Sequence, residues 1–420
     1  MNNETVEIKK GIKLHQIQTN KFKTNLLAVF LSLPLTKETV TKNALIAAVL
    51  RRGTAKMHSQ EMISQNLEEM YGATFDCGIE KTGDNHTIKF YLEAINDQFL
   101  PEKEDLLRRG MDLLLDIIFN PYIEKEMFKE EYVEGEKQNL KQIIEGKIDS
   151  KDRYAIERCV EEMYKDKPYG LYKFGYIEDI EKITSKELYD YYKTMIQECK
   201  IDIFVSGDIK ENITQDIEKN ENIQKLIERE LKLLKDEDNT EVLDVKKVTE
   251  SMQVTQGKLV LGLQINGVEK EESYVGTIYN TILGVGANSK LFQNVREKES
   301  LAYTCGSNYI KRKQLILVRA GIEIKNEEKA LEIIQKQLDD MKNGDFSEED
   351  IGNSKNLILS TIDNITEEQD TEISYYFGQE LSNNFISVEE YRSKIQDITK
   401  EQVQKIASKV KVDTIYFLRD

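Results

Sequence analysis

Residues 183–209 read ITSKELYDYYKTMIQECKIDIFVSGDI, and residues 398–420 read ITKEQVQKIASKVKVDTIYFLRD. Both begin with Ile-Thr, where the threonine is a predicted helix N-cap with an acidic residue soon after it. Each stretch continues as an amphipathic helix and ends in an apolar, β-rich strand. Because this helix–strand unit recurs at about half the chain length, the sequence predicts a duplicated domain.

The openings of the two halves support a duplication. Residues 26–35 (LLAVFLSLPL) and 258–265 (KLVLGLQI) both have the composition of strands. Residues 106–121 (LLRRGMDLLLDIIFNP) form a predicted helix whose wide apolar stripe could cover a sheet, and Pro121 marks its end. Strands and helices grouped in this way predict an α+β architecture.

A charged segment separates the two halves. The stretch from Asp216 to Glu250 is rich in Lys, Glu and Asp, and it predicts a charged helix that leads into a flexible linker. We therefore expect two homologous α+β domains, at 1–215 and 251–420, joined by the linker 216–250. Each domain is expected to be an antiparallel sheet with helices packed on one face.

The charge balance excludes some classes of partner. The formal net charge is −17 at pH 7, which opposes binding to nucleic acid and to anionic membranes. The apolar-rich run at 26–35 is too short to span a bilayer. The first residues, MNNETVEIKKG, have no apolar segment behind their lysines, so a cytoplasmic location is expected.

Cysteine and histidine usage argues against a metal site. The four cysteines form no CxxC pair, so we expect reduced and mostly buried thiols. The three histidines are His15, His58 and His86, and no two lie within one helical turn. An HExxH or HxxEH zinc helix is therefore excluded, and we expect unrelated surface histidines, no metal and no cofactor.

Residues 43–54 read NALIAAVLRRGT. On a helix, Ala44, Ala47 and Ala48 share one face, and methyl groups cannot bind a metal, move a proton or attack a carbonyl. The stretch resembles a helix that ends in basic residues followed by Gly53 as the C′ residue. Taken alone, these residues favour a helix that packs in a core.

Three stretches together resemble the insulinase-type zinc peptidases, the family of pitrilysin and the mitochondrial processing peptidase. Residues 113–131 (LLLDIIFNPYIEKEMFKEE) resemble the family's helix–Asn–Pro–turn–helix passage. Residues 284–307 (GVGANSKLFQNVREKESLAYTCGS) resemble the signature of the second domain and are the most specific match. The resemblance covers nearly the whole chain and implies the duplicated fold of the LuxS/metallopeptidase type.

The third stretch is residues 43–54. The family has His-x-x-Glu-His followed by Gly-Thr, and here those three side chains fall on Ala44, Ala47 and Ala48. In active relatives the histidines bind zinc and the glutamate polarises the attacking water, and a methyl group can do neither. The family's downstream glutamate ligand falls on Ile143, or on Asn139 in another register. The resemblance therefore implies no catalytic residue and no metal ligand in this chain.

Two residues of the second-domain signature are present. Arg296 and Tyr303 match the Arg and Tyr that reach the bound peptide near the scissile bond in family members. Arginine can grip a peptide carbonyl, and a tyrosine hydroxyl can donate to the developing oxyanion. Alternatively, Arg296 pairs with a nearby acid and Tyr303 packs in the core. Gly284 and Gly286 are better explained by a turn than by a phosphate loop.

Residues 151–180 (KDRYAIERCVEEMYKDKPYGLYKFGYIEDI) resemble a bacterial subgroup that lacks the zinc motif and accompanies a motif-bearing relative. The leading hypothesis is a non-catalytic, peptide-binding subunit that supplies Arg296 and Tyr303 to a zinc-bearing homologous partner, in a heterodimer, or that forms a homodimer. A second hypothesis is a scaffold in a translation-factor modification pathway. The third is an enzyme with another nucleophile, such as Ser289 or a cysteine, although no GxSxG elbow occurs.

Overall fold

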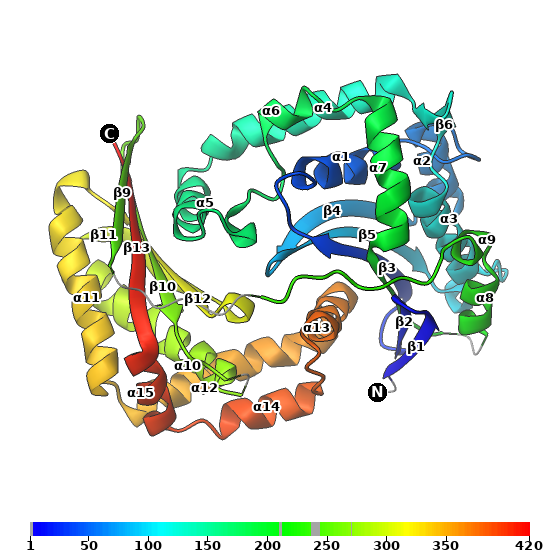
Figure 1. Ribbon diagram of the computed structural model, residues 1–420. Helices are drawn as coiled ribbons and strands as arrows, with labels where there is room; N and C mark the ends of the chain where they lie inside the picture. Colours follow the sequence, from blue (N-terminus) through cyan, green and yellow to red (C-terminus); the bar gives the residue numbers. More distant parts are fainter. Residues whose placement is uncertain (1–2, 210–211, 237–243, 270) are drawn as a thin grey trace. The chain divides into compact units, whose positions relative to one another are not determined.

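The computed structural model describes residues 3–209, 212–236, 244–269 and 271–420 (Figure 1). The chain divides into two compact units, each containing a sheet and a set of helices. Unit 1 comprises Met1–Glu145, Leu171–Lys235 and Gln369–Leu381, and unit 2 comprises Gly146–Gly170, Asp236–Glu368 and Ser382–Asp420. Each unit therefore includes a short segment from the opposite half of the chain.

Unit 1 is built on a six-stranded sheet with the strand order β1-β2-β8-β3-β5-β4. Its strands are β1 (Asn3–Lys9), β2 (Ile12–Gln18), β3 (Thr24–Pro34), β4 (Thr74–Thr82), β5 (Asn85–Ile95) and β8 (Lys200–Gly207). Only β2 and β8 pair in parallel, and the other neighbours are antiparallel. The central β3 is buried along almost its whole length, as a continuous apolar run predicts.

Unit 2 is built on a five-stranded sheet with the order β11-β12-β10-β13-β9. Its strands are β9 (Lys246–Ser251), β10 (Gly257–Ile265), β11 (Ala302–Ile310), β12 (Leu315–Ile322) and β13 (Val410–Arg419). Here too one pair, β9 with β13, is parallel and the other pairs are antiparallel.

The two sheets repeat one topology. The order β2-β8-β3-β5-β4 in unit 1 matches β9-β13-β10-β12-β11 in unit 2. The strands β8 and β13 are the strands of the two helix–strand stretches that begin at Ile183 and Ile398. Thr184 and Thr399 cap the helices of these stretches as predicted. The α+β class and the duplication are confirmed. The parallel pair was not expected, and it arises because the last strand of each half re-enters the sheet after a helix.

Helices fill the rest of each unit. Those of unit 1 are α1 (Val40–Leu50), α2 (Gln60–Glu69), η1 (Asp97–Phe99), α3 (Leu106–Phe119), α4 (Glu130–Glu145), α6 (Ile177–Ile180), α7 (Ser185–Glu198), α8 (Ile213–Lys219), α9 (Glu221–Gln224) and α13 (Gln369–Ser382), with the small hairpin β6 (Ile123–Glu124) and β7 (Met127–Phe128). Those of unit 2 are η2 (Gly146–Ile148), α5 (Lys151–Met163), η3 (Pro168–Gly170), α10 (Ser273–Gly284), η4 (Phe292–Lys298), η5 (Lys311–Lys313), η6 (Ile324–Asn326), α11 (Glu327–Asn343), α12 (Glu348–Asp363), η7 (Asn364–Glu367), α14 (Val388–Gln396) and α15 (Lys400–Lys409).

Both faces of the unit 1 sheet are covered. One face packs against α1, α3 and α7 in a large apolar core. On the other face, Phe30 of β3 stacks on Phe377 of α13 with ring centroids 4.1 Å apart, and Phe204 contacts both rings. The expectation of helices on one face therefore missed α13, which comes from the far half of the chain. An isolated helical pattern does not reveal which sheet the helix covers.

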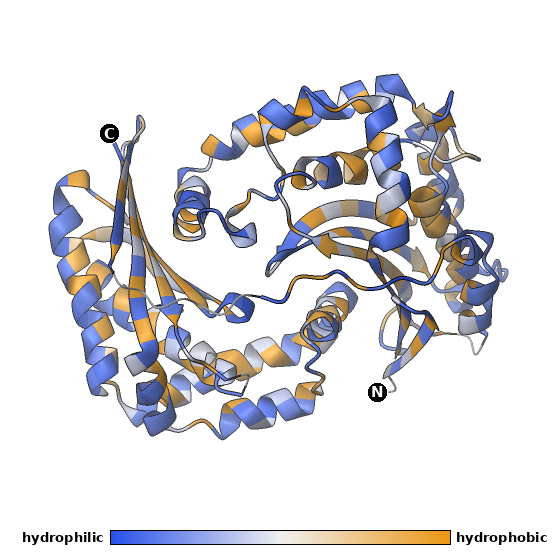
Figure 2. Ribbon diagram, in the orientation of Figure 1, coloured by the Kyte–Doolittle hydropathy of each residue, from blue (hydrophilic) through white to orange (hydrophobic). Residues whose placement is uncertain are grey.

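Helix α5 has the reciprocal position in unit 2. Its Ala155 and Cys159 lie in one apolar cluster with Val260 of β10 and Tyr416 of β13. A Cβ atom at Gly262 would lie 2.7 Å from the Met163 sulfur, so this glycine permits the close approach of α5 to the sheet. Figure 2 shows alternating apolar and polar bands along α11, as expected for a helix that buries one face.

The predicted charged helix at the start of the linker is wrong. After the short α8 and α9, residues 225–236 contain no helix. Arg229 is only 5% exposed, and its guanidinium donates to the carbonyls of Ile196 (2.8 Å) and Cys199 (3.1 Å). The side-chain amide of Asn85 donates a hydrogen bond to the Leu234 carbonyl and accepts one from the Leu234 N–H, both at 2.8 Å. These contacts to unit 1 favour an extended backbone, and the linker residues 237–243 lie outside the described residues.

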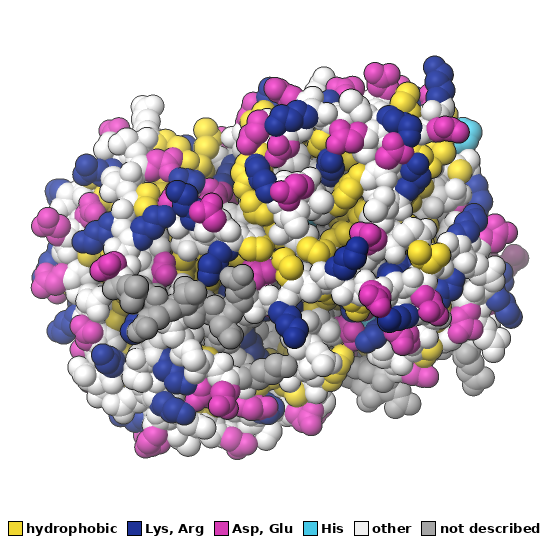
Figure 3. Space-filling view, viewed as in Figure 1, with side chains coloured by type: hydrophobic (Ala, Val, Ile, Leu, Met, Phe, Trp, Pro, Cys, Tyr) yellow, Lys and Arg dark blue, Asp and Glu magenta, His cyan; other side chains and the backbone are white. Residues whose placement is uncertain are grey.

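The surface carries both signs of charge. Figure 3 shows acidic and basic side chains interspersed over the visible face. Among the residues that the structure describes, no helix combines the length and the apolar composition needed to cross a bilayer.

Candidate functional site

The alanine stripe lies on α1, as predicted. Ala44 and Ala47 are 5% and 4% exposed, and Ala48 is partly buried. Helix α1 contacts α4, and Val133 and Leu140 of α4 belong to the same apolar cluster as Ala44 and Ala47. The stripe therefore serves helix packing, because small side chains let two helices approach closely.

The Gly-Thr pair after α1 forms a tight turn. Gly53 does not have the positive φ of a left-handed backbone, so the prediction that it is the C′ glycine of the helix is wrong. Instead, a Cβ atom at Gly53 would lie 2.8 Å from the His58 carbonyl oxygen, which leaves room only for glycine. The Thr54 N–H donates to the Met57 carbonyl at 2.7 Å, and its hydroxyl accepts from the Met57 N–H at 3.0 Å.

Helix α4 supplies no zinc ligand set. Ile143, one predicted position of the downstream ligand, is 47% exposed. Asn139, the other, donates its amide to Glu136 at 3.1 Å. Glu136 itself is only 6% exposed and accepts a hydrogen bond from Arg52. Glu136 is therefore a buried, paired carboxylate rather than part of the charged surface.

Arg296 lies in unit 2 on the π-helix η4. Val295 is fully buried and anchors this helix, while the Arg296 side chain is 44% exposed. The Arg296 guanidinium carbon lies 4.6 Å from the centroid of the Phe292 ring and its Nε lies 3.6 Å from Glu297. Arg296 thus pairs with a nearby acid, as the alternative interpretation expected, and the Phe292 ring helps to orient its guanidinium. Phe292 was not among the predicted site residues, and its only signal in the sequence is its spacing of four residues from Arg296.

Tyr303 follows a tight turn. Ser300 adopts a positive φ of 52°, and the N–H groups of Ser300 and Leu301 donate to the carbonyls of Arg296 and Val295. The register of β11 against β12 shifts between Ala302 and Thr304, which places Tyr303 in a bulge. Tyr303 is 67% exposed, so it does not pack in the core. Bulges commonly re-aim a side chain at a functional position.

The strand that carries Tyr303 is an edge strand. In the unit 2 sheet, β11 has β12 as a neighbour on one side only. Helix α10 lies close against it: a Cβ atom at Gly284 would lie 2.3 Å from the Ser307 hydroxyl, and that hydroxyl donates to the Asn280 side chain at 2.7 Å. Gly284 thus permits close packing, whereas Gly286, at φ 82°, forms the predicted turn.

These features agree with the comparisons with known proteins. Residues 182–358 match the family described as Peptidase M16 inactive domain. The whole chain is 37% identical over 415 residues to the probable inactive metalloprotease YmfF of Bacillus subtilis (strain 168), covering 97% of this chain and 96% of that protein. The chain belongs to the M16 peptidase family.

Two further relatives of this M16 chain are informative. It is 25% identical over 255 residues to the uncharacterized zinc protease YmxG of the same Bacillus strain, covering 60% of each protein. A conserved protein from Enterococcus faecalis V583, whose crystal structure is known, aligns with a TM-score of 0.92 and 28% identity, covering 100% of this chain and 99% of that one.

The M16 chain offers no activated thiol. Burial raises the pKa of Cys77 to about 11 and those of Cys159, Cys199 and Cys305 to about 12. Thiols of this kind stay protonated at neutral pH and are inert. Ser289 is almost fully buried and donates its hydroxyl to the Gly286 carbonyl at 2.8 Å. The hypothesis of another nucleophile therefore gains no support.

The histidines differ from the expectation of surface residues. His15 and His86 are 6% and 0% exposed, and only His58 is exposed. Ligand atoms of His15, Asp202 and Glu380 lie within 4.8 Å of one another.

Lysines occupy that cluster. Lys200 donates to Asp202 and lies 3.0 Å from Glu380, and Lys13 lies 2.7 Å from Glu380. Burial would raise the pKa of Asp202, but the Lys200 charge and the His15 hydrogen bond outweigh it and lower that pKa. Two ammonium groups already balance two carboxylates, so these residues do not fit a divalent metal.

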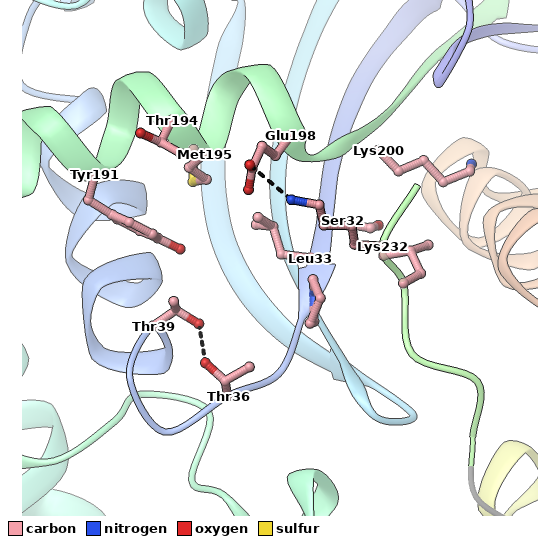
Figure 4. A pocket seen from close by; sticks show the side chains of 12 residues that line it. Ser32, Leu33, Thr36, Thr39, Tyr191, Thr194, Met195, Glu198, Lys200 and Lys232 are labelled. Atoms are coloured by element: carbon pink, nitrogen blue, oxygen red, sulfur yellow. Dashed lines mark hydrogen bonds and ion pairs between the residues drawn. The ribbon is translucent and has the colours of Figure 1, made fainter. Parts of the chain in front are cut away.

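A cavity of about 170 Å³ lies in unit 1 between α7, the end of β3 and the linker residues Lys232 and Leu233 (Figure 4). Figure 4 shows the hydroxyl groups of Thr36, Thr39 and Tyr191 near one another on one side of it. The Glu198 carboxylate is paired with the Lys232 ammonium at 3.0 Å. The cavity contains no catalytic acid–base pair, because its carboxylate is neutralised.

Proposed function

We propose that this chain is a non-catalytic M16 subunit that binds a peptide and supplies Arg296 and Tyr303 to a zinc-bearing homologous partner. The observation that carries the proposal is the contrast between two positions. The three positions of the zinc motif hold alanines packed on α1, while Arg296 and Tyr303 have exposed side chains.

The edge strand β11 supports a peptide-binding role. An edge strand has main-chain N–H and C=O groups available for an added extended segment. Tyr303 lies at the beginning of β11, and the turn at Ser300 connects that strand to the helix of Arg296. Arginine can grip a carbonyl of such a segment, and the tyrosine hydroxyl can donate to an oxyanion.

The names of the relatives fit a divided site, meaning an active site whose zinc motif lies on one chain and whose Arg–Tyr pair lies on another. The relative that this chain matches almost end to end is named a probable inactive metalloprotease, and the same bacterial strain has a more distant relative named a zinc protease. A cell that holds both kinds of chain could combine one zinc motif with one Arg–Tyr pair.

Reconstitution tests the proposal. The purified chain, a zinc-motif homologue from the same organism and their mixture are assayed for hydrolysis of a peptide library. We expect no turnover by this chain alone and at least tenfold more by the mixture than by the homologue alone.

A control uses a homologue in which the glutamate of the His-x-x-Glu-His motif is replaced by glutamine. This change should abolish turnover by the mixture. If this chain binds the homologue but leaves turnover and peptide affinity unchanged, the divided site is refuted. The scaffold hypothesis would then be favoured, because it requires protein contacts alone.

A further inference from the structure

The cavity of unit 1 that Figure 4 shows has an apolar wall as well as its hydroxyl groups. Apolar side chains that line it come from β3, the residue α7 buries there and the linker: Leu33, Pro34, Met195 and Leu233. Its volume is about 170 Å³, and a cavity of about 150 Å³ in another protein can hold benzene. The space therefore suits a body of about one six-membered ring.

The wall at Leu233 is held in place by its neighbours along the chain. Leu234 exchanges two hydrogen bonds with the Asn85 side chain, and the Arg229 guanidinium donates to two carbonyls at the end of α7. A cavity whose walls are already fixed needs little ordering when a ligand enters, which favours binding.

Three hydroxyl groups form a chain on the polar side of the cavity. The Thr36 and Thr39 hydroxyl oxygens lie 2.9 Å apart. Burial raises the pKa of Tyr191, and a hydrogen bond with Thr39 opposes that shift, as expected if Thr39 donates to the phenol oxygen. Since the Thr39 hydroxyl has one proton, Thr36 donates to Thr39, and the proton of each threonine is used within the chain.

The proton of Tyr191 is directed to a residue outside the lining. The Tyr191 hydroxyl donates to Asn43 Oδ1 at 2.7 Å, and the Asn43 amide nitrogen donates to His86 Nδ1 at 3.2 Å. Asn43 and His86 are fully buried, and burial lowers the pKa of His86 to about 3, so the neutral ring can accept at Nδ1. The hydroxyl protons are thus committed, and the chain offers a ligand oxygen lone pairs.

Each charged side chain that lines the cavity has a partner. Glu198 pairs with Lys232 at 3.0 Å. Lys200 is only 5% exposed, donates to Asp202 and lies 3.0 Å from Glu380. A charged ligand would lose hydration without gaining a counter-charge, which is costly. A ligand carbonyl would find no free proton on the hydroxyl chain, whereas a ligand hydroxyl can donate to it.

We propose that this cavity is a binding site for small neutral molecules that carry a hydroxyl group on an apolar body, the class of phenols and short alcohols. The ligand hydroxyl donates to the hydroxyl chain, and its ring or hydrocarbon chain packs against the apolar wall. The inference is independent of the peptide-binding role, because Arg296 and Tyr303 belong to unit 2.

The test uses phenol, toluene and benzoate, which share one ring and differ in the donor and the charge. Each is titrated into the intact chain, and NMR follows the methyl resonance of Met195, assigned with Met195→Leu, in protein with ¹³C-labelled methionine methyl groups. We expect a saturable shift with phenol, at least tenfold weaker binding of toluene and no shift with benzoate.

Variants locate the hydroxyl contact. Tyr191→Phe should weaken phenol binding at least tenfold, because a site built to bind a hydroxyl loses an acceptor. Tyr192→Phe is the matched control, since the Tyr192 hydroxyl donates to the Ile118 carbonyl and lies outside the lining. It should leave phenol binding unchanged. Thr36→Val keeps the Tyr191–Asn43 bond and tests the chain even if Tyr191→Phe does not fold.

Three results would overturn the proposal. The first is a Met195 methyl resonance that does not respond to phenol up to its solubility limit. The second is equal affinity for phenol and toluene, which would mean that the hydroxyl chain contributes nothing. The third is unchanged phenol affinity in the folded variants among Tyr191→Phe and Thr36→Val, which would place the phenol hydroxyl elsewhere.

Discussion

Helix α1 of unit 1 and the segment from α10 to β11 of unit 2 occupy equivalent places, since each follows a central strand of its sheet, β3 or β10. They differ in which side chains solvent can reach. On α1 the motif positions Ala44 and Ala47 are nearly fully buried, whereas Tyr303 is 67% exposed. In unit 1 the positions of the zinc motif are part of the core, and in unit 2 the Tyr303 position of the second-domain signature is on the surface.

The difference in exposure shows what positions contribute when their side chains cannot bind zinc or transfer a proton. Once the side chains at positions 44, 47 and 48 are reduced to methyl groups, packing against α4 is their remaining contribution, and alanine costs the helix nothing. An exposed tyrosine in a bulge gives no such packing benefit. Exposure of Tyr303 is what the proposed peptide-binding role requires, and the predictions below test this contrast.

The largest effect is expected at Tyr303. In a reconstituted complex, Tyr303→Phe should lower kcat by about 10²–10³, because it removes one donor to the oxyanion. Arg296→Ala should raise KM as well, because it removes ground-state binding. Steady-state peptide hydrolysis measures both effects. Glu299→Gln is the matched control for a neighbouring exposed residue, and full activity of both site variants would contradict the divided site.

The edge strands of the two sheets can also be compared through the reactivity of their thiols, because Cys77 lies on β4 and Cys305 lies on β11. Burial raises both pKa values, to about 11 and about 12. A raised pKa means less thiolate, so at pH 8 Cys77 should react with a disulfide reagent about a hundredfold, and Cys305 about a thousandfold, more slowly than an exposed cysteine. The rates should rise tenfold per pH unit from pH 8 to pH 10. A plateau below pH 9 at either thiol would show an activated cysteine.

Arg52→Ala should destabilise unit 1 by about 2–3 kcal/mol, because it leaves the buried Glu136 carboxylate without its charged partner. Urea unfolding monitored by circular dichroism measures this loss. Glu136→Gln in the Arg52→Ala background should recover part of it, since the uncompensated charge is then gone. An unchanged unfolding midpoint for Arg52→Ala would mean that the pair contributes nothing to α1.

Ala44→His should cost about 1–3 kcal/mol by overpacking the interface between α1 and α4. Thermal melts in the presence and absence of zinc measure the effect, and zinc should not recover the loss. A variant as stable as the wild type would show that the stripe is an open site rather than a packing surface.

The smallest effect is expected for Ala48→Ser. This position is partly buried, so the hydroxyl can reach solvent and the loss should stay within about 0.5 kcal/mol, the size of the propensity difference. Differential scanning calorimetry can resolve such a change. A loss above 2 kcal/mol would mean that Ala48 is as tightly packed as Ala44.

The sequence predicted the class of fold because its signals are local. Thr184 and Thr399 cap their helices by accepting the N–H of the third residue on, and such contacts lie within one helical turn. The positions of the three alanines could also be predicted, because the family motif is defined by residue spacing along one helix. Arg296 and Tyr303 came from the same kind of motif, and only the structure reveals their exposure.

Long-range partners could not be predicted. Glu380 on α13 lies beside Lys200, and Gln369 bonds the Ser206 carbonyl at 2.9 Å, although more than 160 residues separate each pair along the chain. The charged pattern of residues 222–236 favours a helix locally, but Arg229 instead donates to the carbonyls of Ile196 and Cys199. A buried guanidinium must satisfy its donors, and that requirement outweighs helix propensity.

The sequence by itself determined that this chain has two similar α+β halves and no side chain at positions 44, 47 and 48 that can bind zinc. Helical and strand periodicity, end caps and ligand chemistry depend only on residue type and short spacing. The tertiary structure alone decided that α5 and α13 each cover the sheet built from the other half, that Glu136 is buried and that Tyr303 is exposed. Burial depends on which distant segments meet, and no local pattern encodes that choice.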